Sequence, residues 1–185
     1  KDRFSKQTLF QTAWRELYGN LIEWHGLSDG ARVVAVNPRD MTLETDFDRI
    51  KADVANVIPP QRAGRVAIDA GIADATGWCP VDAGTFESTV AQGVHVIGDA
   101  AILNAMPKSA FAANAQAKLC ALQIVRNLAG VNPLGPKLIN TCYSLVAPRY
   151  GISVAGVYTA EGQRWNEVAG AGGTSPLAAD AGVRA

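Results

Sequence analysis

The sequence predicts an α/β protein, because helical and extended patterns alternate along it. Apolar residues recur with a helical period over residues 7–18, and an Ala-rich helical stretch covers residues 109–128. A short apolar string precedes that second helix at residues 94–97, and two extended segments follow it at residues 138–146 and 152–158.

Composition indicates an ordered chain with no special charge class. Of its 185 residues, 48% are hydrophobic and 18% are charged, which suffices for a sizeable core. Lys plus Arg equals Asp plus Glu at 17 each, so neither nucleic acid nor an anionic surface is implied as a partner. No apolar run reaches the ~20 residues of a transmembrane helix. With three widely spaced cysteines, two histidines and no CxxC, we also expect no protein-built metal site.

The first half of the chain predicts a helix and a hairpin. The helix over residues 7–18 has apolar residues at i, i+3, i+4 and i+7, and Gly19 follows it as a C-cap. Two extended segments, residues 32–36 and 41–47, flank the turn formers Asn-Pro-Arg-Asp. Residues 52–58 (ADVANVI) form an apolar run that ends at a Pro-Pro pair, so we expect a buried strand there.

In the second half, a short helix is expected over residues 63–70 and a second buried strand over residues 94–97 (VHVI). Pro107-Lys108-Ser109 opens the longest helix, whose small residues allow close packing against a sheet or a ring system. The tail from Gly170 has no periodicity, and we expect a flexible or surface-hugging end.

The most informative segment is Gly98-Asp99-Ala100. Gly98 lets a ligand approach the backbone, and the Asp99 carboxylate can accept hydrogen bonds from ligand hydroxyls such as those of a ribityl chain. Free N–H groups at the start of the following helix favour negative charge, as on the N1/O2 edge of a reduced flavin. The alternative is a strand, a turn and a helix that bind nothing, since Gly-Asp is common in turns.

Several longer stretches resemble the flavoprotein subunit of flavocytochrome c sulfide dehydrogenase, and together they cover nearly the whole chain. The motifs MPKSxFxANxQ and NTCYSxxAPxYGIS are specific, and VIGDA also resembles the second FAD-contacting segment of two-dinucleotide-fold flavoproteins. The stretches are KDRFSKQTLF (1–10), VIPPQRAG (57–64), GWCPVDAGTFES (77–88) with HVIGDAAILNAMPKSAFAANAQAK (95–118), and NTCYSLVAPRYGISVAGVY (140–158).

The resemblance implies a partial FAD/NAD(P)-binding two-dinucleotide fold plus a small C-terminal α+β region. Residues 1–50 would be a remnant of the nucleotide-binding middle domain, and residues 51–131 the second segment of the FAD-binding domain. Residues 132–185 would form the flavin's other wall and the cytochrome interface.

The resemblance also assigns roles to residues. Gly98, Asp99 and Ala100 would contact the FAD, with Asp99 holding its ribityl chain, while Lys108 and Ser109 would lie by the flavin pyrimidine edge. Cys142 would be one half of a redox-active disulfide, which suits the chemistry of a reactive thiolate. Without the resemblance, a buried structural thiol is the commoner interpretation of such a cysteine.

The implied activity is sulfide oxidation, in which two electrons pass to FAD and leave singly to a c-type cytochrome subunit. A periplasmic location follows from the resemblance alone, because residues 1–6 contain no apolar export signal.

No GxGxxG loop for the FAD pyrophosphate occurs in the sequence, so we expect the C-terminal part of a longer protein. We expect weak or no FAD binding by this chain alone, self-association through exposed faces, and a partner for Cys142 other than Cys79 or Cys120. Two alternatives stay open: a cofactor-less interaction or scaffold module, and a relative of sulfide:quinone oxidoreductases.

Overall fold

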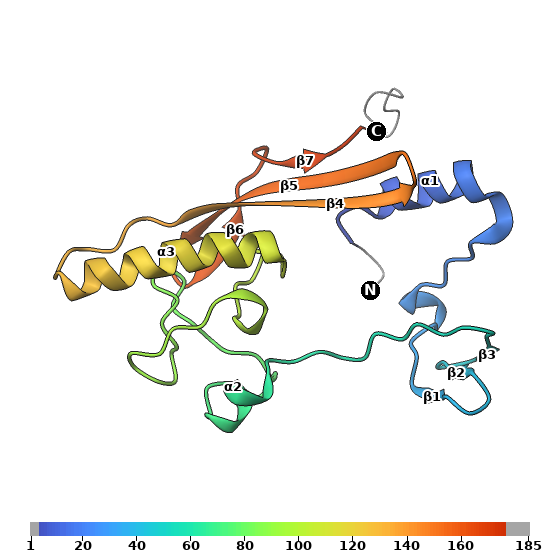
Figure 1. Ribbon diagram of the computed structural model, residues 1–185, viewed down its shortest axis with the longest axis horizontal. Helices are drawn as coiled ribbons and strands as arrows, with labels where there is room; N and C mark the ends of the chain where they lie inside the picture. Colours follow the sequence, from blue (N-terminus) through green and yellow to red (C-terminus); the bar gives the residue numbers. More distant parts are fainter. Residues whose placement is uncertain (1–3, 177–185) are drawn as a thin grey trace. The chain divides into compact units, whose positions relative to one another are not determined.

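The computed structural model describes residues 4–176 and confirms the mixed α/β class, with helices and two β-sheets in the described residues (Figure 1). These residues fall into two compact units. Unit 1 contains residues 4–60 and 145–151, and unit 2 contains residues 61–144 and 152–176. Within the described ranges, no helix has both the length and the apolar character needed to cross a membrane.

Unit 1 begins with helix α1 (Gln7–Tyr18), which has the predicted bounds. Leu9 and Ala13, one turn apart, are buried, as an amphipathic helix requires. Gly19 ends the helix at φ 55°, a conformation that glycine adopts without strain. The Tyr18 hydroxyl donates a hydrogen bond to the Val146 carbonyl at 2.6 Å, within the same unit. Two short 3₁₀ helices follow, η1 (Gly19–Leu21) and η2 (Leu27–Asp29).

The predicted hairpin of unit 1 is confirmed with shorter strands. Strands β1 (Ala35–Asn37), β2 (Thr42–Glu44) and β3 (Arg49–Lys51) form an antiparallel sheet in that order. Strand β2 stops at Glu44 because Thr45 turns the chain: its N–H donates to the Asp48 carbonyl at 2.8 Å.

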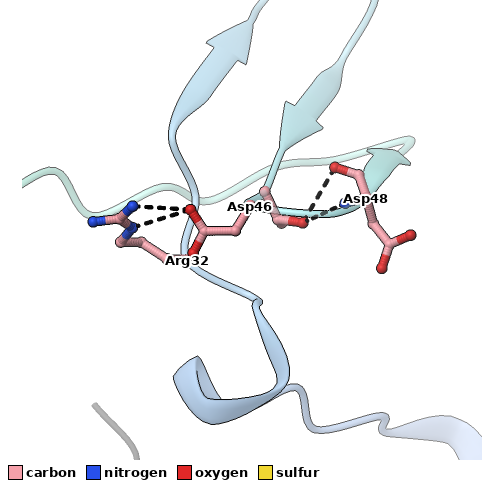
Figure 2. A network of polar contacts seen from close by, with 4 residues as sticks. Arg32, Asp46 and Asp48 are labelled. Carbon is pink, nitrogen blue, oxygen red and sulfur yellow. Dashed lines mark hydrogen bonds and ion pairs between the residues drawn. The ribbon is translucent and has the colours of Figure 1, made fainter.

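An ion pair lies beside this turn. Figure 2 shows the Arg32 guanidinium directed at the Asp46 carboxylate, with Nη2 at 2.9 Å from Oδ1. The Asp48 N–H donates to the Thr45 hydroxyl at 2.9 Å. These contacts lie beyond the paired residues of β1 and β2, where a longer hairpin was expected, and backbone bonds such as Val34 N–H to the Glu44 carbonyl at 2.8 Å accompany them.

The buried strand predicted over residues 52–58 is wrong. This segment is irregular, and Val54 and Ile58 are 84% and 77% exposed. The Ala52 N–H still donates to the Met41 carbonyl at 2.9 Å, beside the end of β3. An apolar run forms a strand only where a neighbouring strand pairs with its backbone, and no strand of the β1-β2-β3 sheet pairs with residues 53–58.

Unit 2 is built on one long helix and a second sheet. The predicted helices at residues 63–70 and 109–128 are confirmed as α2 and α3, and the two predicted strands are confirmed with greater length. The elements are α2 (Arg65–Asp69), η3 (Gly98–Ala100), α3 (Ala110–Leu128), β4 (Lys137–Ala147), β5 (Tyr150–Glu161), β6 (Arg164–Glu167) and β7 (Gly173–Thr174). The end of β4 and the start of β5, within residues 145–151, belong to unit 1.

The sheet of unit 2 has the order β4-β5-β6, and β7 pairs with β5. Because Thr174 pairs with Val154 and residues 170–174 are exposed, the tail from Gly170 follows the surface of the sheet up to residue 176, which is the surface-hugging alternative of the two expected. The remainder of that tail lies outside the described residues. Small and large side chains of α3 and of the sheet share one core, including Ala112, Cys120, Leu138, Tyr158 and Trp165.

The second buried strand, predicted over residues 94–97, is also wrong. The segment is extended and partly exposed, and its pairing is a single bridge between Glu87 and His95. The Val96 N–H donates to the Phe86 carbonyl at 2.9 Å. The segment over residues 94–97 therefore pairs with a loop, residues 86–88, along one edge. That loop leaves the apolar side chains of the segment partly exposed to solvent.

Gln123 fastens two loops to α3. Its side chain is 2% exposed. Its Nε2 donates to the Gly84 carbonyl at 2.8 Å and to the Leu134 carbonyl at 2.9 Å, and its Oε1 accepts the Leu134 N–H at 3.0 Å. A buried amide with this many partners is costly to remove, because each partner then lacks its hydrogen bond.

We therefore expect Gln123→Ala to lower the free energy of unfolding by about 3 kcal/mol. Urea denaturation measures the change, and Asn127→Ala, on an exposed position of the same helix, is the control. A Gln123→Ala variant as stable as the control would contradict this role.

Candidate functional site

A pocket of about 170 Å³ lies in unit 2, beside η3 and the start of α3. Its lining is mainly apolar, with the Lys108 ammonium as its charged group. Such a lining suits a ligand with an apolar body and a polar edge. The residues that line the pocket are Trp78, Gly98, Ala101, Ile102, Leu103, Asn104, Met106, Pro107, Lys108 and Gln116.

The segment Gly98-Asp99-Ala100 forms η3 at the edge of this pocket. Gly98 has φ 69°, and its N–H donates to Gln116 Oε1 at 2.7 Å. Since Gln116 is 2% exposed and belongs to α3, the helix holds the turn through a buried hydrogen bond. The Asp99 side chain remains exposed, where its carboxylate can accept hydrogen bonds.

Lys108 is fixed by three contacts. Its ammonium donates to the Asp99 carbonyl and, at 3.5 Å, to the Ala101 carbonyl, and it lies 3.7 Å from the centre of the Trp78 ring. Partial burial lowers the pKa of Lys108, while the Asp99 carboxylate opposes that shift. A cation is therefore held at the pocket wall next to η3.

Ser109 is the N-cap of α3. Its backbone is extended, and its Oγ accepts the Ala112 N–H at 3.1 Å. The N–H groups of Ala110 and Phe111 have no acceptor within the helix, because the first turn lacks preceding carbonyls. The Ser109 hydroxyl also donates to Asn140 Oδ1 on β4 at 2.5 Å, so it joins the helix to the sheet.

Cys142 lies two residues beyond Asn140 on β4, so the two side chains point to the same face of the strand. Asn140 Nδ2 donates to Cys142 Sγ at 3.4 Å. Cys142 is half-buried, whereas Cys79 and Cys120 are buried and burial raises the pKa of both thiols. Of these three cysteines, which all lie within the described residues, Cys142 is thus the accessible one.

The structure brings the predicted residues together in two adjoining groups. Gly98 and Lys108 line the pocket, while Ser109 begins the hydrogen-bonded series Ser109–Asn140–Cys142. The sequence did not predict the role of Asn140 or the cation–π contact between the Lys108 ammonium and the Trp78 ring. The signal for Asn140 was available, since a polar residue two positions before a cysteine in a strand shares its face.

These residues fit a flavin by the chemistry of their donors and acceptors. A flavin presents ribityl hydroxyls, a polar pyrimidine edge and an apolar ring. The site offers the Asp99 carboxylate, the Lys108 ammonium, helix N–H groups and an apolar wall that includes Trp78 and Met106. Direct contact of these side chains with a flavin stays a prediction. No group of three metal-binding side chains occurs in residues 4–176.

Comparison with known proteins gives the class and then the family. Residues 135–185 match a family model described as flavocytochrome c sulphide dehydrogenase, flavin-binding, which identifies a flavoprotein of the oxidoreductase class. Residues 1–59 match a second model, described as sulfide dehydrogenase (flavocytochrome c) flavoprotein chain, central. The chain belongs to the family of flavocytochrome c sulfide dehydrogenase flavoproteins. Asn140 and Cys142 lie within the flavin-binding match.

Gly98 offers a direct test of the turn that shapes the pocket. A Cβ at this position would lie 3.4 Å from Ala113 Cβ, an ordinary contact, so strain would come from φ 69° alone. We expect Gly98→Ala to lower the free energy of unfolding by about 1–2 kcal/mol. Gly135→Ala is the matched control, because Gly135 lies in a loop, outside the left-handed region, and has open space around it. Equal denaturation midpoints for the two variants would show that the turn does not require glycine.

Proposed function

We propose that this chain forms the ribityl and pyrimidine side of the FAD site in a sulfide dehydrogenase that passes electrons to a c-type cytochrome subunit. The observation that carries the proposal is the hydrogen-bonded series Ser109–Asn140–Cys142. It joins the helix start, which is suited to a flavin edge, to the accessible thiol. Membership of the family supports a flavin and a sulfide dehydrogenase activity.

In this proposal, the Asp99 carboxylate accepts hydrogen bonds from ribityl hydroxyls. The Lys108 ammonium and the N–H groups of the first turn of α3 face the pyrimidine edge and stabilise negative charge there. FAD, when bound, takes up the two electrons released when sulfide becomes neutral sulfur, and gives them up singly. The expected location is the periplasm.

Cys142 is proposed as one half of a redox disulfide whose second cysteine belongs to another segment. Cys79 and Cys120 suit that role less well, because both are free thiols buried in the core. Attack of hydrosulfide on the disulfide would form a persulfide on one cysteine and release the other as a thiolate, so one S–S bond forms as another breaks. Since the sequence contains no pyrophosphate loop of the GxGxxG type, we propose that the chain alone binds FAD weakly.

The test uses the longest natural polypeptide that contains this sequence, purified with its flavin and its cytochrome. We expect Cys142→Ser to slow the reduction of the cytochrome by sulfide at least about 100-fold, because the disulfide can no longer form. The flavin absorbance should remain, which separates chemistry from cofactor loss. Thr141→Ala, on the opposite face of β4, is the control. An unchanged rate in Cys142→Ser would overturn the proposed function.

A further inference from the structure

We propose that Asn140 is a positioning residue that orients the Cys142 sulfur and stabilises negative charge on it, and that Ser109 sets the direction of the Asn140 amide. The catalytic meaning of this inference rests on the proposed function. Its structural basis is independent, because it follows from hydrogen bonds between α3 and β4.

The first step concerns the Ser109 hydroxyl, which carries one proton. Its oxygen accepts the Ala112 N–H at 3.1 Å as the helix cap. Its proton is then available for Asn140 Oδ1, which lies at 2.5 Å. The cap therefore determines which atom of Asn140 faces the helix: an acceptor satisfies the hydroxyl proton, and an NH₂ group would not.

The second step concerns the amide itself. With Oδ1 directed at Ser109, Nδ2 is directed at Cys142 and lies 3.4 Å from Sγ. The opposite orientation would leave the Ser109 proton without this acceptor and would turn an oxygen lone pair toward the sulfur. The helix cap thus selects the orientation in which an N–H group meets the sulfur.

The third step is burial. Asn140 is 2% exposed, so solvent cannot easily replace either of its hydrogen bonds. An N–H donor interacts more strongly with a charged acceptor than with a neutral one. The bond from Asn140 therefore favours a negatively charged sulfur, both when Cys142 attacks and when it leaves a disulfide.

Alkylation of Cys142 by iodoacetamide provides a readout that does not depend on catalysis. In this reaction the sulfur bonds to the acetamide carbon, iodide leaves and the thiol proton passes to the buffer. The longest natural polypeptide that contains this sequence is reduced, pulsed with the reagent and digested with trypsin. Mass spectrometry then follows the peptide of residues 138–149, in which Cys142 is the sole cysteine.

Asn140→Asp keeps the acceptor for Ser109 and replaces the N–H donor with a carboxylate oxygen. We expect it to slow alkylation of Cys142 about 10-fold at constant pH. Asn114→Asp makes the same charge change at an exposed position of α3 and should leave the rate unchanged. A wild-type rate in Asn140→Asp would overturn the inference.

A second pair of variants avoids new charge. Ser109→Ala frees the Asn140 amide and should slow alkylation about 3-fold, whereas Ser109→Thr keeps the hydroxyl and should restore the wild-type rate. Equal rates for Ser109→Ala and Ser109→Thr would contradict the role of the cap. If Asn140→Asp fails to fold, the two Ser109 variants still test whether Asn140 positions the Cys142 sulfur.

The proposed function and this inference can fail separately. Slow sulfide oxidation in Cys142→Ser, combined with normal alkylation in Asn140→Asp, would overturn the positioning role alone. Normal sulfide oxidation in Cys142→Ser, combined with slow alkylation in Asn140→Asp, would support the positioning role and overturn the proposed function.

Discussion

The hydroxyl of Ser109 makes the two hydrogen bonds on which the candidate site depends. One caps α3 and so fixes where the first turn of the helix begins; the other reaches Asn140 on β4 and so fixes the strand that carries Cys142. Because a single oxygen serves both bonds, the helix start and the thiol cannot shift independently. The Ser109 hydroxyl therefore positions both the candidate flavin edge and the candidate redox sulfur.

Helix α3 repeats this arrangement along its length. Ser109, Gln116 and Gln123 follow one another at intervals of seven residues. Seven residues are about two helical turns, so the three side chains lie on one face. The two glutamines are buried, and each side chain holds a segment that has little regular structure of its own: Gln116 holds η3, and Gln123 holds the loops at residues 84 and 134. The small alanines between them allow this close approach. The long helix α3 (Figure 1) thus contributes Gln116 to the lining of the pocket and holds η3 beside it.

Sequence patterns predicted the elements whose signal is local. Helix α1, helix α3 and the strands β4 and β5 follow from periodicity and from the residues that end them. The predictions of strands at residues 52–58 and 94–97 were wrong, because an apolar run does not indicate whether another strand will pair with it. The site shows the same limit. Strand alternation indicates that Asn140 shares a face with Cys142, but the bond from Ser109 to Asn140 spans 31 positions, and no local pattern reports that contact.

In the proposed site, η3 and the first turn of α3 form one wall of the flavin pocket. Amide hydrogen exchange of the longest natural polypeptide that contains this sequence, compared with and without bound FAD, tests this placement. We expect bound FAD to slow exchange at residues 99–100 of η3 and at residues 110–111 of the first turn of α3, because the flavin would shield them from solvent. Unchanged exchange at these residues, in protein whose absorbance spectrum shows bound flavin, would place the flavin elsewhere.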